Sequence, residues 1–281
     1  MKGHSRIKEE TKFLFPSLAA CMSDAAMSET DIQHTAKVLD LVNFPDRAGL
    51  FKSIQEHWQR SQGFALATLN LDHIVKMRGN PDFFQSYKAH SHIVADGNPI
   101  VWLSRMAGRE VDLMPGSELI EPLAEMAARD NVPVAFLGAT PETLDRAAQR
   151  LTIQYPGLRV VEQIAPPFGF DPQGVKAVSY LEAIRQSGAQ LCFLALGAPK
   201  QEQLAIEGRR HAPGCGFVSI GAGLDFIAGS QTRAPKWVRT LALEWVWRML
   251  RNPKRLAGRY WQCILILPGL VREARRIGRQ N

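Results

Sequence analysis

The feature that most constrains the fold of this chain is the alternation of short apolar runs with helix-forming segments. Between the runs lie segments with helical apolar spacing and helix-start signals, such as Thr140 followed by Pro141. Continuous apolar strands that alternate with helices are typical of a mostly parallel sheet covered by helices on both faces. We therefore predict a Rossmann-like α/β domain over residues 46–232. Its expected strands cover residues 64–70, 91–96, 132–138, 158–164, 189–197 and 214–221.

Two further segments flank this domain. Residues 1–45 begin with charges of both signs and are interpreted as a partly ordered N-terminal extension. From residue 233 to residue 281 the strand pattern ends, and we predict a helical appendage with one helix over 235–253 and breaks at Pro253 and Pro268. Residues 222–235 are expected to form a loop.

The positive charge of the chain is concentrated in the C-terminal appendage. The net charge is +7, and residues 233–281 hold 12 of the 34 Lys and Arg residues but only 2 of the 27 Asp and Glu residues. Tryptophans and aliphatic residues are mixed with these arginines, as in helices that lie on an anionic membrane surface. The alternatives are a solvated helix face packed on the domain and, less favoured, a nucleic-acid site, for which no recognisable motif is present.

The remaining composition excludes several classes of protein. The four cysteines lie far apart without a C-x-x-C pair, which indicates reduced thiols and no zinc site. The seven histidines form no ligand pattern, and no D-x-D triplet occurs, so we expect no metal site and no cofactor. The late apolar run over 264–271 is far shorter than the roughly 20 residues that span a bilayer. We expect no secretory signal and no membrane-spanning segment.

Four loops follow predicted strands and should therefore meet at one edge of the sheet. They cover residues 68–73, 95–99, 197–202 and 221–226. Ligands of open α/β sheets bind beyond the carboxyl ends of the strands, and small residues there let backbone amides approach a phosphate or a sugar. Neither a dinucleotide-binding G-x-G-x-x-G nor a P-loop is present, which disfavours a dehydrogenase or a P-loop kinase.

Asp96 ends an apolar strand and precedes a glycine, where a partly desolvated carboxylate can serve as a base. Thr68 and Asn70 offer a hydroxyl and an amide to sugar or diphosphate oxygens. The alternatives are an ordinary turn aspartate and ordinary strand-end caps. If the substrate is a nucleoside diphosphate derivative, protein cations must neutralise it, and the arginine-rich appendage is the expected source.

Five ordered motifs together resemble the WecG/TagA/CpsF family of bacterial glycosyltransferases over roughly residues 60–262. The motifs are "TLNLDHIV", the "ADG" of Asp96, "LGAPKQE", "IGAGLDFIAGSQTRAPKWV" and "LEWVWRMLRNPKRLAGRY". The resemblance implies an inverting, metal-independent enzyme that moves a hexose-type sugar from a UDP-sugar to a sugar on undecaprenyl diphosphate. It also implies a peripheral position on the cytoplasmic face of the membrane, a role in exopolysaccharide or other surface polysaccharide synthesis, and the possibility of homo-oligomers.

The resemblance also implies roles for individual residues. Asp96 is the expected catalytic base, and Thr68 and Gln201 are expected near the reacting sugars. Lys200 and Glu202 are as readily interpreted as solvent-facing residues at a helix start. The nucleotide sugar is expected to be held by Asn70, Gly221, Gly223 and Asp225, and the diphosphate to be reached by Arg248, Arg251, Arg255 and Arg259.

Two other functions remain open from the sequence. A non-catalytic UDP-sugar-binding scaffold of a polysaccharide assembly complex would share the same nucleotide site, although Asp96, Thr68 and Gln201 together disfavour it. A soluble nucleotide-dependent dehydrogenase would leave the basic appendage unexplained.

Overall fold

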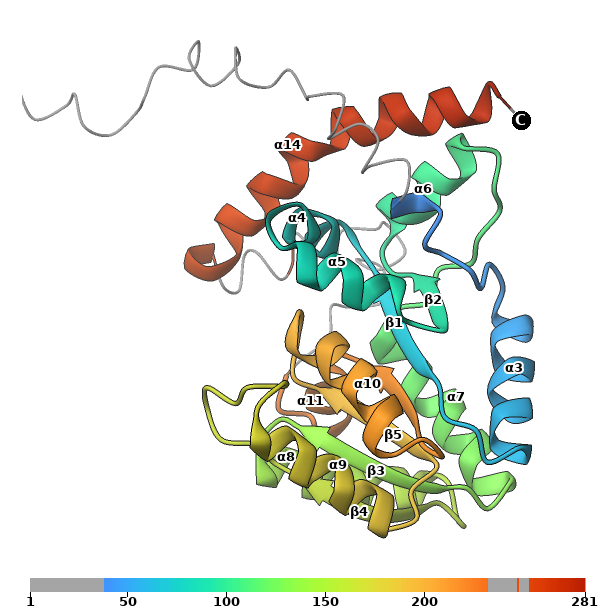
Figure 1. Cartoon of the computed structure of the whole chain (residues 1–281), viewed down its shortest axis with the longest axis vertical. Coiled ribbons are helices and arrows are strands. Elements are labelled where there is room, and N and C mark those ends of the chain that lie inside the picture. The colour runs from blue at the N-terminus through green and yellow to red at the C-terminus, as the bar shows by residue number, and fades with distance from the viewer. Residues whose placement is uncertain (1–37, 232–246, 248–252, 281) are drawn as a thin grey trace, which may run out of the picture.

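The computed structural model describes residues 38–231, 247 and 253–280, and its centre is one six-stranded sheet (Figure 1). Every strand pair is parallel, and the strand order is β2-β1-β6-β5-β3-β4. The α/β fold with a mostly parallel sheet is therefore confirmed. The strands are β1 (Ala65–Leu69), β2 (His92–Ala95), β3 (Pro133–Gly138), β4 (Arg159–Ile164), β5 (Leu191–Ala195) and β6 (Gly216–Ser219).

Helices cover both faces of the sheet because successive strand residues point to opposite sides. The described helices are α3 (Arg47–Gln59), α4 (Leu71–Gly79), α5 (Pro81–Lys88), α6 (Asn98–Met106), α7 (Gly116–Arg129), α8 (Pro141–Gln154), α9 (Val175–Gln186), α10 (Lys200–His211), α11 (Gly223–Ala228) and α14 (Pro253–Gly278). Helices α3, α7, α8 and α11 share one hydrophobic cluster with the sheet, and α9 and α10 share another. Helices α4, α5, α6 and α14 form a third cluster at β1 and β2.

Polar side chains cap the two helices α4 and α8, which follow β1 and β3. Thr140 accepts a hydrogen bond from the amide of Thr143 at the start of α8, and Pro141 occupies the first turn, as predicted. Asn70 caps α4 in the same way by accepting from the amide of His73. The end of β1 is therefore tied directly to the start of α4.

Two sequence predictions about the later part of the chain are wrong. Residues 223–228, expected in a loop, form the short helix α11, whose Gly223 lies against Ile120 of α7. Pro268, expected to break the chain's helical structure, lies inside the continuous 26-residue helix α14. Figure 1 shows α14 as one bent helix, and a proline that bends a helix without ending it is tolerated when tertiary packing holds both halves.

Both ends of the described chain pack on the β1/β2 side of the molecule. Val38 and Leu39 are buried, as are Leu270 and Ala274 of α14, in the same cluster. Figure 1 shows α14 beside α4 and α6, at the end of the molecule opposite β4. The boundaries drawn at residues 45 and 232 stay predictions, and the helix expected over 235–253 lies almost wholly outside the described residues.

Among the helices that the structure describes, none is both long enough and apolar enough to cross a bilayer.

Candidate functional site

Thr68, Asn70 and Asp96 meet at the carboxyl ends of β1 and β2. The last register pair of these strands is Leu69 with Ala95, so Asn70 and Asp96 are the next residues along each strand. Thr68 and Asn70 lie two residues apart and therefore share one face of the sheet. The structure brings together the three side chains that sequence reasoning selected at this edge.

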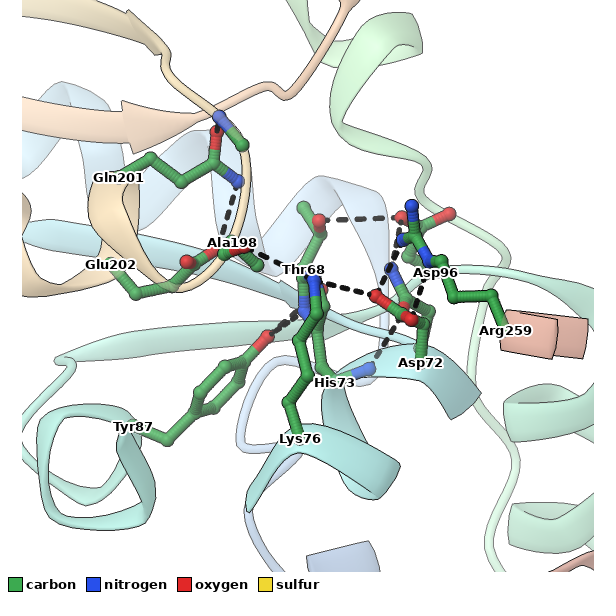
Figure 2. Close-up of polar contacts among 12 residues, drawn as sticks. Thr68, Asp72, His73, Lys76, Tyr87, Asp96, Ala198, Gln201, Glu202 and Arg259 are labelled. Atoms are coloured by element: carbon green, nitrogen blue, oxygen red, sulfur yellow. Dashed lines mark hydrogen bonds and ion pairs between the residues drawn. The ribbon is translucent and has the colours of Figure 1, made fainter. Parts of the chain in front are cut away.

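Asp96 receives hydrogen bonds from Thr68 on β1 and from Asn70 directly after it. Its Oδ2 accepts from Thr68 Oγ1 at 3.4 Å and from Asn70 Nδ2 at 3.3 Å (Figure 2). Its backbone amide donates to the carbonyl of Leu69 at 2.7 Å, which fixes the turn after β2 against β1. The carboxylate is half-buried, so it is both held in place and accessible to a substrate hydroxyl.

Asp72, in the first turn of α4, forms ion pairs with two cationic side chains. Its carboxylate lies 2.9 Å from Lys76 Nζ and accepts a two-pronged pair from Arg259 of α14, at 2.6 Å from Nε and 2.5 Å from the terminal nitrogen. Burial alone would raise the pKa of Asp72, but hydrogen bonds and positive charge from Arg259 and Lys76 lower it below its ordinary value. The group is an ionised centre with one carboxylate and two cations.

Lys76 extends this ionised centre across the edge of the sheet. Its Nζ donates to the carbonyl of Ala198, in the loop after β5, at 3.0 Å. Arg259, Asp72, Lys76 and Ala198 thus form a continuous polar chain from α14 to the loop that precedes α10 (Figure 2).

Two uncharged side chains, Tyr87 and His73, form a hydrogen-bonded network with the backbone of Thr68. The hydroxyl of Tyr87 donates to the carbonyl of Thr68 at 2.9 Å and lies 2.6 Å from Nδ1 of His73. Burial lowers the pKa of His73 to about 3 and raises that of Tyr87 well above its usual range. Both rings are therefore uncharged near neutral pH, and they fix the backbone of β1 without adding charge to the site.

Gln201 joins two loops at the neighbouring strands β5 and β6. Its Oε1 accepts from the amide of Gly197 at 3.2 Å and from the amide of Gly221 at 3.0 Å. Both glycines have positive φ, at 73° and 56°, a conformation that glycine adopts without strain. The side chain of Gln201 is 3% exposed, so the structure places it as a cross-link between loops at this edge.

The two neighbours of Gln201 on α10 make different contacts. Lys200 Nζ donates to the carbonyl of Phe170 at 2.6 Å. Glu202 is fully buried, so the interpretation of this residue as a solvent-facing helix start is wrong. Its Oε1 accepts from Gln201 Nε2 at 2.8 Å, and burial raises its pKa to about 7.

Gly223 and Asp225, the other predicted residues after β6, contact other parts of the molecule than Asp96. A Cβ at Gly223 would lie 2.4 Å from Cδ1 of Ile120 on α7, so a larger residue here would force the Ile120 side chain to move. Asp225 accepts from Gln231 Nε2 at 3.2 Å, and burial raises its pKa although a hydrogen bond with Thr143 of α8 opposes that shift. Asp225 therefore belongs to the β3/β6 side of the edge.

The appendage arginines are described only in part. Arg248 and Arg251 lie outside the described residues. Arg255 lies in α14, but its side chain is also outside the described part of the chain. Arg259 is the appendage arginine whose side chain the structure brings to the site, and the roles expected for all four stay predictions.

Sequence reasoning missed Asp72, Lys76 and Glu202. Asp72 and Lys76 have helical i, i+4 spacing directly after β1, a signal that could have identified an ion pair beside the site. No signal in the sequence marks Glu202 as buried. Within the described ranges, no group of three or more His, Cys, Asp or Glu side chains is arranged to hold a metal ion.

The arrangement offers three chemical functions at one edge of the sheet. Asp96 can accept a proton, Lys76 and Arg259 can neutralise an anion, and the buried Gln201 fixes the glycine loops after β5 and β6 at the same edge. A model of the glycosyl transferase WecG/TagA/CpsF family matches residues 39–280, which is nearly the whole chain. The chain therefore belongs to the WecG/TagA/CpsF family and is a glycosyltransferase of cell-surface polysaccharide biosynthesis.

Proposed function

We propose that this glycosyltransferase moves a hexose-type sugar from a UDP-sugar to a sugar carried on polyprenyl (undecaprenyl) diphosphate, with inversion and without a metal ion. The observation that carries the proposal is the carboxylate of Asp96, held by Thr68 and Asn70, in the same cluster as the cations Lys76 and Arg259 and their partner Asp72 (Figure 2). One base and a cationic group are the two requirements of a single displacement at a sugar carbon.

Asp96 is the base of this displacement. The acceptor hydroxyl oxygen attacks the anomeric carbon, the bond from that carbon to the donor diphosphate oxygen breaks, and UDP leaves with the bonding electrons. The acceptor proton passes to the Asp96 carboxylate. Because attack occurs opposite the leaving group, the configuration at the anomeric carbon inverts. Hydrogen bonds from Thr68 and Asn70 hold the carboxylate in the orientation that the proton transfer needs.

Positive charge on the leaving diphosphate comes from both the core and α14. Lys76 supplies a point charge from α4, and Arg259 supplies a planar two-pronged donor that fits a phosphate as well as it fits a carboxylate. In this proposal the diphosphate shares these two cations with Asp72. Arg248, Arg251 and Arg255 are proposed to add further charge from the same part of the chain.

The C-terminal helix is proposed to place the site at the membrane, where a polyprenyl-linked acceptor resides. Arg272, Arg275 and Arg279 are exposed on the last turns of α14, and Trp261 and Leu265 of the same helix are 60% and 54% exposed. Apolar and cationic side chains exposed on one helix favour binding to anionic headgroups. The enzyme would then be peripheral, on the cytoplasmic face of the membrane.

The proposal is tested by UDP release from a panel of UDP-sugars, with a short-chain polyprenyl-diphosphate-linked sugar as acceptor. Acceptor-dependent release that persists in EDTA is the expected result and identifies the donor. Release that EDTA abolishes would overturn metal independence. UDP binding by calorimetry without turnover on any donor would favour the non-catalytic scaffold.

A further inference from the structure

Glu202 is a fully buried carboxyl group beside the proposed site, and the mechanism above does not use it. Its Oε1 accepts from Gln201, while its Oε2 has no hydrogen-bond partner among the described residues. A carboxyl group in such a place lowers stability relative to an apolar side chain of similar size. The charges that face it are Lys76 and Asp72 of α4, and the hydroxyl of Tyr87 on α5 also senses it.

The amide of Gln201 can have only one orientation in this network. Two backbone N–H groups, from Gly197 and Gly221, point at the same side-chain atom, which must therefore be the oxygen. The NH₂ group then faces Glu202, whose Oε1 is an acceptor at 2.8 Å. Rotation of the amide by 180° would place donors against donors at one end and oxygen against oxygen at the other.

This orientation matters because of what the Gln201 oxygen holds together. Gly197 follows β5 and Gly221 follows β6, which are adjacent strands, and β6 pairs in turn with β1. Both loops have a glycine with positive φ at the point of contact, where glycine restricts the backbone less than any other residue would. Figure 2 shows Gln201 and Glu202 on the side of the cluster opposite Arg259 and Asp96.

We propose that Glu202 is a positioning residue, which holds the Gln201 amide in the orientation that joins the glycine loops after β5 and β6. The inference rests on the proposed function in one respect, namely that these two loops line the sugar-nucleotide site. The second N–H of Gln201, which has no partner among the described residues, is then the donor that this side chain has left for a ligand.

The test compares two substitutions of Glu202 that have nearly the same volume. Glu202→Met removes the acceptor and the buried carboxyl group together. We expect its melting temperature to be unchanged or higher, while kcat/KM for the donor falls at least about 10-fold, because one lost orienting hydrogen bond to a polar group is of that order. Glu202→Gln keeps an acceptor oxygen for Gln201, and we expect it to restore most of kcat/KM.

Two further variants separate positioning from general effects. Glu207→Gln, on the same helix but partly exposed beside Arg210, is the matched control and should change neither quantity. Gln201→Met and the double variant Gln201→Met with Glu202→Met should have the same kcat/KM, because Glu202 acts only through Gln201. Additive losses of kcat/KM in the double variant would overturn the proposal. A fall in the melting temperature of Glu202→Met that accounts for its loss of activity would overturn it too.

A readout independent of turnover uses ¹⁵N-glycine labelling of the full chain. The amide signals of Gly197 and Gly221 should both shift in Glu202→Met and stay in place in Glu207→Gln. In the unsubstituted protein both signals should titrate together with a midpoint near pH 7, and this titration should vanish in Glu202→Gln. Unshifted glycine signals in Glu202→Met would refute the positioning role. If no UDP-sugar is turned over, the proposed function fails while this measurement still decides the role of Glu202.

Discussion

The two halves of the carboxyl-terminal edge of the sheet are built from different chemistry. At β1 and β2 the side chains are polar or charged and partly accessible, with Asp96 directly after β2 and the pair of Asp72 and Arg259 beside it. At β5 and β6 the edge consists of glycine loops closed by the buried side chains of Gln201 and Glu202. The first half supplies charged groups, and the second half supplies loops of fixed conformation.

This difference indicates that the two halves have different roles in sugar transfer. Proton transfer and neutralisation of a diphosphate need charged groups in contact with substrate. A site for a sugar and its nucleotide needs loops of fixed conformation, and a locked neutral amide provides this without repelling an anion. Substitutions in the first half should therefore change the chemical step, and substitutions in the second half should change positioning while the fold persists.

The largest expected effect is that of Asp96→Asn in the charged half. Loss of a general base typically lowers the rate by about 10²- to 10⁴-fold, so we expect kcat to fall by that factor while UDP binding by calorimetry stays within about twofold. Asp145→Asn, at an exposed position of α8, is the control and should be normal. Turnover of Asp96→Asn close to that of the unsubstituted enzyme would remove Asp96 from the mechanism.

Membrane attachment is expected to depend on α14, which packs on the charged half. Each arginine near an anionic surface contributes about 1 kcal/mol, so replacing Arg272, Arg275 and Arg279 with Gln should weaken binding to anionic vesicles roughly 100-fold. Sedimentation with vesicles containing phosphatidylglycerol measures this, and neutral phosphatidylcholine vesicles are the control. If the triple variant bound anionic vesicles as strongly as the unsubstituted protein does, the proposed attachment would be contradicted.

The next effect concerns the pair of Arg259 and Asp72. A hydrogen bond to a charged group contributes about 1.5 to 3 kcal/mol, so Arg259→Gln should lower kcat/KM for the donor roughly 10- to 100-fold. Asp72→Asn should lower it less, because both cations remain but are held less firmly. The double variant should lose less than the sum of the two effects. A rise in kcat/KM for Asp72→Asn would show that Asp72 competes with the diphosphate. Arg146→Gln, exposed on α8, is the control.

The smallest effect of a single substitution is on the dependence of stability on pH, and its sign differs between the buried histidines and Glu202. Burial lowers the pKa of His73 and of His92 to about 3 and that of His90 to about 4, from 6.5. Below pH 6.5 these side chains take up protons only when the chain unfolds, so each should lower the free energy of unfolding by on the order of 1 kcal/mol per pH unit. The free energy of unfolding that the protein loses in acid is regained as the pH rises to 6.5.

Glu202 has the opposite sign because its folded-state pKa is raised from 4.5 to about 7. Its favourable contribution is complete below pH 4.5 and is lost as the pH rises through 7, so it offsets one histidine between these values. Urea unfolding at several pH values should show a flatter acid loss in His73→Gln and a steeper one in Glu202→Gln. Identical slopes in both variants would contradict the assignment of these charges.

Much of the fold could be predicted from the sequence, because buried strands and capped helices leave strong local signals. All six strands lie within the runs predicted for them, and Thr140 caps α8 as expected. The errors at residues 223–228 and at Pro268 have one physical cause. Packing of α11 on α7 and of α14 on the β1/β2 cluster decides the local structure there against the local preference.

The candidate site could be predicted where it follows from strand ends. Thr68, Asn70 and Asp96 could be placed together because adjacent parallel strands end at one edge. The contacts of Asp72 with Arg259 and of Gln201 with the Gly221 amide could not be predicted, since these partners are 187 and 20 residues apart in the sequence. Such contacts depend on how the elements pack, and local patterns carry no record of them.

The configuration of the product tests the central claim most directly. NMR of the linked sugar, compared with the anomeric configuration of the UDP-sugar donor, distinguishes one displacement from two. With Asp96 as the base of one displacement, we predict a glycosidic bond of inverted configuration. A product with retained configuration would require a second displacement and would contradict the assignment of Asp96.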